Sequence, residues 1–149
     1  VLERAARMLQ PVARQRKVEL TCRADEAAAV RATEGDVHQI LYNLMENGVK
    51  YTAPGGFVHT SVSVEEGRVV IAVSDNGIGI PVEDMPHIFE RFYRVDKARS
   101  RQIGGTGLGL SIVGDTVQRR GGEIGVAPRE GGGTVFTVSF PQAEPEVTA

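Results

Sequence analysis

The feature that most limits the possible folds is a pair of alternating stretches joined by a short connection. Residues 57–64 (FVHTSVSV) and 69–75 (VVIAVSD) largely alternate apolar with polar side chains, and the connection between them contains Gly67. Such alternation is typical of strands with one buried face, and a short connection with glycine predicts a hairpin. A doubly wound parallel fold needs helices between its strands throughout, so this pattern favours a mostly antiparallel sheet.

Three helices and four further strands are predicted around the hairpin. Apolar residues at helical spacing indicate helices over residues 1–16, from Glu34 to before Pro54, and over residues 107–120. Shorter apolar runs predict strands at residues 18–23, 28–33, 123–127 and 134–140. The predicted fold is therefore α+β, a two-layer sandwich in which three helices cover one mixed, mostly antiparallel sheet of five to six strands. Residues 1–141 would form this one domain, and residues 142–149 a C-terminal tail.

Composition limits the kinds of partner that we expect the chain to bind. The chain has 149 residues, 41% of them hydrophobic, and a net charge of −2, so we expect one globular domain with no general reason to bind nucleic acid or a membrane surface. No run of about 18 apolar residues predicts a membrane span, which favours a cytoplasmic chain. Cys22 is the only cysteine, so it cannot form an internal disulfide. We expect it to be a small core residue of the strand at 18–23.

The second helix carries an unusual polar stripe opposite its apolar face. At about 100° per residue, the stripe contains Asp36, Gln39, Asn43, Asn47 and Lys50. A solvated face is the simpler interpretation. Asparagine, however, is a poor helix former whose carbonyl oxygen is an acceptable ligand for Mg²⁺, and a lysine one turn away could reach phosphate. The stripe is therefore also a candidate face for Mg²⁺ and phosphate.

A second candidate site lies at the end of the strand at 69–75. Period-two alternation places Asp75 on the same face as the apolar residues of that strand, so a carboxylate enters an apolar layer. A buried carboxylate needs donors, and the exocyclic amine of adenine is one. The alternative is a cap on a tight turn formed with Gly77 and Gly79. By the same alternation Thr134 faces the core, where its hydroxyl could join a base-binding site or bond only to backbone.

Two further segments are candidates for contact with phosphate. Residues 104–113 (GGTGLGLSIV) lead into the third helix, where glycines allow backbone N–H groups to approach phosphate oxygens. The segment lacks the Gly-Lys of a Walker A loop and follows a loop rather than a strand, unlike a dinucleotide-binding fingerprint. Within the long loop of residues 76–106, HIFERFYRVDKARSR carries Phe89 and Phe92 among arginines. It could be an ATP lid anchored by its two rings, or a charged surface loop with two anchoring rings.

Taken in order, four stretches resemble the N, G1, F and G2 boxes of bacterial sensor histidine kinases. They are NLMENGVKYT (43–52), DNGIGIP (75–81), IFERFYRVD (88–96) and GGTGLGLSIV (104–113), and the final GGGTVFTVSFP is similar to that family's closing strand. Four ordered motifs are far more specific than any one of them, and the resemblance covers roughly residues 1–141. It implies the catalytic ATP-binding domain, with the Bergerat fold shared by gyrase, mismatch-repair and chaperone ATPases.

The resemblance implies a Mg-ATP site with a role for each matched residue of the N box. Asn47 would ligate Mg²⁺, and Asn43 would lie close to the phosphates. Lys50 would contact phosphate, and Tyr51 would flank the nucleotide.

The other boxes would supply the base contacts and the lid. Asp75 would accept the adenine amine with Thr134 in support, and Arg94 of the lid would reach the γ-phosphate, so that Lys50 and Arg94 are the implied catalytic residues. The remaining implied contacts are Gly77, Gly79, Tyr93, Gly105, Gly107, Leu108 and Gly109.

Two departures from the family pattern affect the interpretation. The family's phosphoacceptor histidine lies in a separate helical domain within a His-acid-x-basic-Thr-Pro type of motif, which neither His38 nor His87 matches. The chain is therefore expected to bind ATP without containing its own acceptor. Gly48 stands where alanine is commoner, and it should weaken the helix slightly without touching the ligands.

The resemblance implies transfer of the γ-phosphoryl of ATP to a histidine in two-component signal transduction. The implied partners are the phosphoacceptor helical domain of the same or a sister subunit and a downstream response regulator, within a parent protein that could be anchored in the inner membrane. The alternatives are a Bergerat-fold ATPase clamp, a protein-serine kinase of the anti-sigma type, and a nucleotide-binding regulator. The clamp would need a glutamate four residues before Asn47, where Asn43 stands, and the complete F box argues against the serine kinase.

Overall fold

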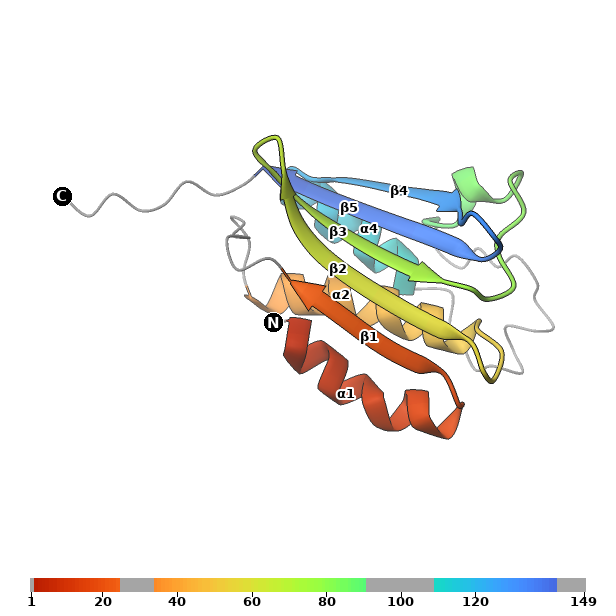
Figure 1. Ribbon diagram of the computed structural model, residues 1–149. Coiled ribbons are helices and arrows are strands. Elements are labelled where there is room, and N and C mark those ends of the chain that lie inside the picture. Colours follow the sequence, from red (N-terminus) through yellow and green to blue (C-terminus); the bar gives the residue numbers. More distant parts are fainter. Residues whose placement is uncertain (1, 25–33, 91–108, 142–149) are drawn as a thin grey trace.

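The computed structural model describes residues 2–24, 34–90 and 109–141, which form one sheet with helices on one of its faces (Figure 1). The helices are α1 (Leu2–Gln15), α2 (Glu34–Lys50) and α4 (Gly109–Arg119), with a short 3₁₀ helix, η1 (Met85–His87). The strands are β1 (Glu19–Ala24), β2 (Phe57–Glu65), β3 (Arg68–Asp75), β4 (Glu123–Pro128) and β5 (Thr134–Pro141).

The strands lie in the order β1-β2-β3-β5-β4. β1 pairs with β2 in parallel, whereas the other three neighbouring pairs are antiparallel. The turn between β2 and β3 consists of Glu66 and Gly67, whose φ angles of 49° and 76° are both left-handed, as in the turns that suit twisted hairpins. The predicted hairpin and the mixed, mostly antiparallel sheet are therefore confirmed.

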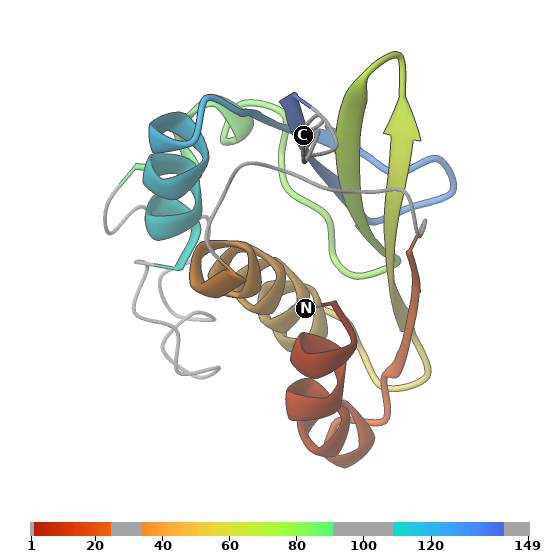
Figure 2. The ribbon, with the colours of Figure 1, turned by 90° about the vertical axis from the view of Figure 1, so that its left-hand side faces the viewer.

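The second layer consists of three helices on one side of the sheet, with α2 between α1 and α4 (Figure 2). α2 packs against both other helices and against β2 and β3. Its apolar face therefore lies in the centre of the domain, and its polar stripe lies along the side that meets α4. This position makes α2 the element that links the sheet to both neighbouring helices.

The core fills the space between the helices and one face of the sheet. Alternate residues of β3 and of β5 are buried, as expected for strands with a single covered face. Each buried Leu, Val or Phe side chain contributes about 1.5–3 kcal/mol through removal from water. The largest fully buried side chains are Leu9, Ile40, Leu41, Leu44, Met45, Val49, Val58, Val73, Val113, Val117, Phe136 and Phe140.

Cys22 is exposed, so the prediction that it is a core residue is wrong. Its strand, β1, is one of the two edge strands of the sheet, and only Leu20 of that strand is buried. The strand expected at residues 28–33 lies outside the described residues. Among the described helices, none has the length and apolar character needed to cross a bilayer.

Candidate nucleotide-binding site

Asp75 is the last residue of β3, and its carboxylate is buried in the layer between sheet and helices. Only 5% of the residue is exposed. On the neighbouring strands Val58 and Thr134 lie directly beside it, so all three belong to the face that covers the core. Oδ1 accepts a hydrogen bond from the backbone N–H of Gly77 at 2.9 Å. The carboxylate thus lies in an apolar layer, as the alternation predicts, and it also caps the following turn.

Glycines surround Asp75 where side chains would collide with backbone. A Cβ on Gly77 would overlap the carbonyl oxygen of Tyr51, and a Cβ on Gly133 would overlap the carbonyl oxygen of Asp75 itself. Gly133 has a φ of 108°, and Gly79 a φ of 76°, so both also need a conformation that suits glycine. Closely packed backbone segments therefore surround the carboxylate of Asp75.

Gly48 belongs to this same cluster of close contacts. A Cβ at this position would lie 3.1 and 3.2 Å from the two methyl carbons of Val58 and 3.8 Å from Oδ2 of Asp75. The sequence indicates only a slight weakening of the helix at Gly48. The structure adds that an alanine at this position would press on Val58 and would lie at ordinary contact distance from the Asp75 carboxylate.

Burial raises the pKa of the Asp75 carboxyl above its usual value. Loss of hydration is the largest cause, and the backbone amides of Gly77 and Thr134 and the charge of Arg129 oppose it. A cation–π contact holds Arg129 nearby: its guanidinium lies over the Phe57 ring, 4.8 Å from the ring centre. A carboxyl in either protonation state keeps an acceptor oxygen, so the group can accept a hydrogen bond from an amine.

Thr52 is a residue of the site that sequence reasoning missed. It is 3% exposed, and its Oγ1 is buried without a hydrogen-bond partner among the described residues. The hydroxyl lies 3.0 Å from the place of a Cβ on Gly77, next to the turn that Asp75 caps. A buried unpaired hydroxyl costs about 1–3 kcal/mol, so Thr52 is a candidate contact for a ligand beside Asp75.

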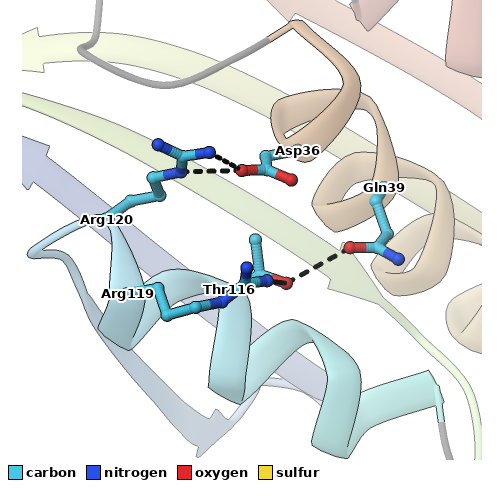
Figure 3. A network of polar contacts seen from close by, with 5 residues as sticks. All are labelled: Asp36, Gln39, Thr116, Arg119 and Arg120. Carbon is cyan, nitrogen blue, oxygen red and sulfur yellow. Dashed lines mark hydrogen bonds and ion pairs between the residues drawn. The ribbon is translucent and has the colours of Figure 1, made fainter.

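The polar stripe of α2 divides into two parts. In its first part Asp36 accepts a hydrogen bond from Nε of Arg120 at 2.7 Å, and Oε1 of Gln39 accepts one from the hydroxyl of Thr116 at 3.2 Å (Figure 3). Arg119 donates to the same hydroxyl at 3.3 Å. These partners belong to α4 and the residue after it, so this part of the stripe joins two helices.

The second part of the stripe contains Asn43, Asn47 and Lys50. Oδ1 of Asn43 lies 3.6 Å from the place of a Cβ on Gly109, the first residue of α4. The first turn of a helix has backbone N–H groups without helical partners and the positive end of the helix dipole, which together favour an anion. An amide oxygen of α2 and the N-terminus of α4 therefore meet at one place suited to phosphate.

The last turn of α2 connects this phosphate region with the surroundings of Asp75. Nζ of Lys50 lies 3.2 Å from Oε1 of Glu46. The next residue, Tyr51, is half-buried, and its carbonyl oxygen accepts a hydrogen bond from the backbone N–H of Ile78 at 3.2 Å. The fold thereby brings the N box and the G1 box into direct contact.

Several predicted site residues lie outside the described part of the chain: Tyr93, Arg94, Gly105, Gly107 and Leu108. Their roles stay predictions. Phe89, just before this segment, makes an edge-to-face contact with Phe136 at a centroid distance of 6.2 Å and packs against the core. Phe89 therefore packs against the core as expected, whereas Phe92 lies outside the described residues.

The donor set of α2 suits a magnesium ion that arrives with a nucleotide. Within the described residues, no group of three or more His, Cys, Asp or Glu side chains is arranged to hold a metal ion. Mg²⁺ is commonly held by one or two protein oxygens, with waters and substrate phosphates in its other positions. The half-buried amide of Asn47, one turn after Asn43, fits that requirement as a single ligand.

Comparison with known proteins defines the class of this chain. Residues 32–144 match the family of histidine kinase-, DNA gyrase B- and HSP90-like ATPases, and the chain belongs to that family. Within it, the chain is similar to the catalytic domains of sensor histidine kinases, which confirms the resemblance carried by the four boxes.

Two relatives show how similar the sequences are. The chain is 45% identical over 122 residues to the sensor histidine kinase WalK of Bacillus subtilis, covering 80% of this chain and 20% of WalK. It is 40% identical over 126 residues to the sensor-like histidine kinase SenX3 of Mycolicibacterium smegmatis, covering 85% of this chain and 33% of SenX3. The chain thus spans a fifth to a third of the length of these relatives.

Solved structures agree in fold. Full-length ShkA in complex with AMPPNP matches with a TM-score of 0.82 and 32% identity, over 98% of this chain and 30% of ShkA. The catalytic domain of histidine kinase ThkA, in a nucleotide-free form, matches with a TM-score of 0.82 and 26% identity, over 96% of this chain and 92% of that chain.

Proposed function

We propose that this chain binds Mg-ATP and donates the γ-phosphoryl group to a histidine on a separate phosphoacceptor domain. The observation that carries the proposal is the approach of Asn43 on α2 to Gly109, the first residue of α4. It places the polar stripe of α2, with Asn47 one turn after Asn43 as the candidate Mg²⁺ ligand, beside a helix N-terminus suited to phosphate. Membership of the ATPase family supports the same ligand.

Each part of the site would act on a different part of the nucleotide. Asp75 would accept a hydrogen bond from the exocyclic amine of adenine, with Thr134 beside it on β5. Lys50 would neutralise phosphate charge, and Arg94 of the lid would add charge at the γ-phosphate. A magnesium ion held by Asn47 would further reduce the charge of the triphosphate and stabilise the leaving diphosphate.

The proposed reaction is transfer and not hydrolysis. The bond between the γ-phosphorus and its bridging oxygen breaks, a bond from phosphorus to an imidazole nitrogen forms, and the imidazole loses its proton. Phosphoryl transfer asks the protein mainly for positioning and charge neutralisation. A water-activating glutamate would be expected four residues before Asn47, and Asn43 occupies that position.

The acceptor and the signalling context belong to the proposal as well. The acceptor histidine would lie in the helical domain of the same or a sister subunit, and a response regulator would receive the group afterwards. Residues 1–141 would act as the catalytic domain on the cytoplasmic side of a parent protein that an inner-membrane segment could anchor. The names of WalK and SenX3 as histidine kinases support this context.

Calorimetric titration with Mg-AMPPNP and a transfer assay would test the proposal. We expect binding that needs Mg²⁺, and acid-labile phosphohistidine when a helical acceptor domain from a related kinase is supplied with ATP. Asn47→Ala should lose both, whereas Gln118→Ala, at an exposed position of α4, should lose neither. Absence of nucleotide binding by the folded chain would refute the proposal. Rapid ATP hydrolysis without transfer would favour the clamp-type ATPase, and serine phosphorylation of a protein substrate the serine kinase.

A further inference from the structure

The turn after α1 is joined to the segment after α2 by backbone hydrogen bonds. The N–H of Gly55 donates to the carbonyl of Lys17 at 2.8 Å, and the N–H of Glu19 donates to the carbonyl of Gly56 at 3.0 Å. These bonds connect residues far apart in the sequence, and both reach consecutive residues of the loop that leads from α2 into β2. They hold the end of α1 next to the end of α2.

The end of α1 is itself a fixed structure. Lys17 has a φ of 58°, and its N–H donates to the carbonyl of Arg14 at 3.1 Å, while the N–H of Val18 donates to the carbonyl of Ala13 at 2.9 Å. This pair of bonds around a left-handed residue is the Schellman arrangement of a helix C-terminus. Arg16 is therefore the last residue before the left-handed turn, and its backbone direction is set by that motif.

Arg16 extends its side chain from this turn to the final residue of α2. Its Nη2 donates to the backbone carbonyl of Lys50 at 2.8 Å. The last carbonyls of a helix have no partner within the helix, and a cation there also complements the helix dipole. Nε of Arg16 is buried without a hydrogen-bond partner among the described residues, so the side chain keeps this position although one of its donors is unsatisfied.

The other side of the same helix end is held by the turn that follows β3, within the G1 box (75–81). The carbonyl of Tyr51 accepts the N–H of Ile78 at 3.2 Å, and Gly77 packs directly against that carbonyl. The consecutive carbonyls of Lys50 and Tyr51 thus accept hydrogen bonds from two different segments, the turn after α1 and the turn after β3. Without the guanidinium, the last turn would be held from one side only, and helix ends held in this way fray readily.

We infer that Arg16 is a positioning residue for phosphate binding, which holds the last turn of α2 so that Lys50 and Tyr51 face the nucleotide. The inference rests on the proposed function, because it takes Lys50 as a phosphate contact. A fixed backbone reduces the conformational freedom that Lys50 loses when it meets phosphate, and this preorganisation increases affinity without any direct contact of Arg16 with the ligand.

Three variants of the whole chain test the inference. Arg16→Met removes the donor, Arg16→Lys keeps one donor for the carbonyl of Lys50, and Arg14→Met removes a charge from the exposed side of the same helical turn. We expect Arg16→Met to weaken Mg-AMPPNP binding about fivefold to tenfold and to leave adenosine binding unchanged, because adenosine has no phosphate. Arg16→Lys should retain most of the affinity, and Arg14→Met all of it.

Amide hydrogen exchange without nucleotide provides a readout that does not depend on the proposed function. Exchange of the Tyr51 amide, which bonds to the carbonyl of Asn47, should be faster in Arg16→Met and unchanged in Arg14→Met. Unchanged exchange at Tyr51 would overturn the inference even if the wild-type chain bound no nucleotide. Wild-type affinity for Mg-AMPPNP in Arg16→Met, or an equal loss for adenosine and Mg-AMPPNP, would also overturn it, the latter by indicating a purely structural role.

Discussion

Nζ of Lys50 lies 3.2 Å from Oε1 of Glu46, one turn earlier on α2, and about a quarter of each side chain is exposed (28% and 29%). Glu46 also interacts with Tyr42: burial raises the pKa of the Tyr42 hydroxyl most, and the charge and hydrogen bond of Glu46 raise it further. Glu46 therefore fixes the position of the Lys50 ammonium group but partly neutralises its positive charge. A phosphate that binds Lys50 must compete with this carboxylate.

Replacement of Glu46 by Gln should tighten the binding of a triphosphate. Glutamine keeps a partner for Tyr42 and removes the negative charge that competes for Lys50, so we expect Mg-AMPPNP affinity to rise about twofold to fivefold, the effect of one partly exposed pair. Calorimetry at low and high salt would measure it, and the gain should shrink with salt. In a Lys50→Met background the gain should disappear. An equal gain there would show that Glu46 repels the phosphates directly and does not act through Lys50.

Gly133 and Gly132 form a matched pair for testing the close packing under Asp75. Their φ angles of 108° and 110° both lie in the range that alanine rarely adopts, so either substitution strains the backbone. Only at Gly133 would the added Cβ also overlap the carbonyl oxygen of Asp75, whereas the space around Gly132 is open. Gly132→Ala should lower the free energy of unfolding by about 1–2 kcal/mol, and Gly133→Ala by at least about 2 kcal/mol more, as measured in urea. Equal losses would mean that the contact relaxes without cost.

The sequence predicts most of the architecture because hydrophobic period and turn chemistry are local signals. The alternation in β2 and β3 and the spacing in α2 gave the correct element types, and the order of the four boxes gave the family. Cys22 was mispredicted because period alone does not reveal which strand is at the edge of the sheet.

The candidate site was less predictable where it depends on packing between distant segments. The division of the α2 stripe follows from the position of Thr116 and Arg120 on the facing helix, which no local pattern encodes. The burial of the Thr52 hydroxyl and the contact from Arg16 to Lys50 likewise arise from tertiary structure. By contrast, the burial of Asp75 could be predicted because a strand's alternation continues to its last residue.

Lys17 offers a test of the helix end that supports Arg16. A lysine with a φ of 58° occupies the position where helices that end in this way most often have glycine. Lys17→Gly should therefore raise the free energy of unfolding by about 0.5–1 kcal/mol, because the left-handed conformation costs glycine little. The same substitution at Arg14, within α1, should lower it by about 1 kcal/mol. A loss of stability in Lys17→Gly would show that the lysine side chain contributes more than the backbone strain costs.

Asp75→Asn should separate the stability of the fold from its affinity for nucleotide. Since the pKa of Asp75 is raised in the folded chain, the folded state holds the proton more tightly than the unfolded state. The contribution of Asp75 to stability is then complete below about pH 4, the usual pKa of the group, and is lost as the pH rises through the higher folded value. Asparagine removes this dependence and can still accept the hydrogen bond from Gly77. Asp75→Asn should thus be at least as stable as the wild type at neutral pH.

Nucleotide affinity should change in the opposite direction in the same variant. If the asparagine oxygen caps the turn at Gly77, its NH₂ group points toward the amine of adenine, and two donors then oppose each other. We expect Mg-AMPPNP affinity to fall at least about tenfold. Unfolding in urea from about pH 4 to about pH 8 and calorimetry at neutral pH would measure the two effects. Parallel pH profiles for the wild type and Asp75→Asn would contradict the raised pKa, and unchanged affinity would remove Asp75 from the proposed adenine contact.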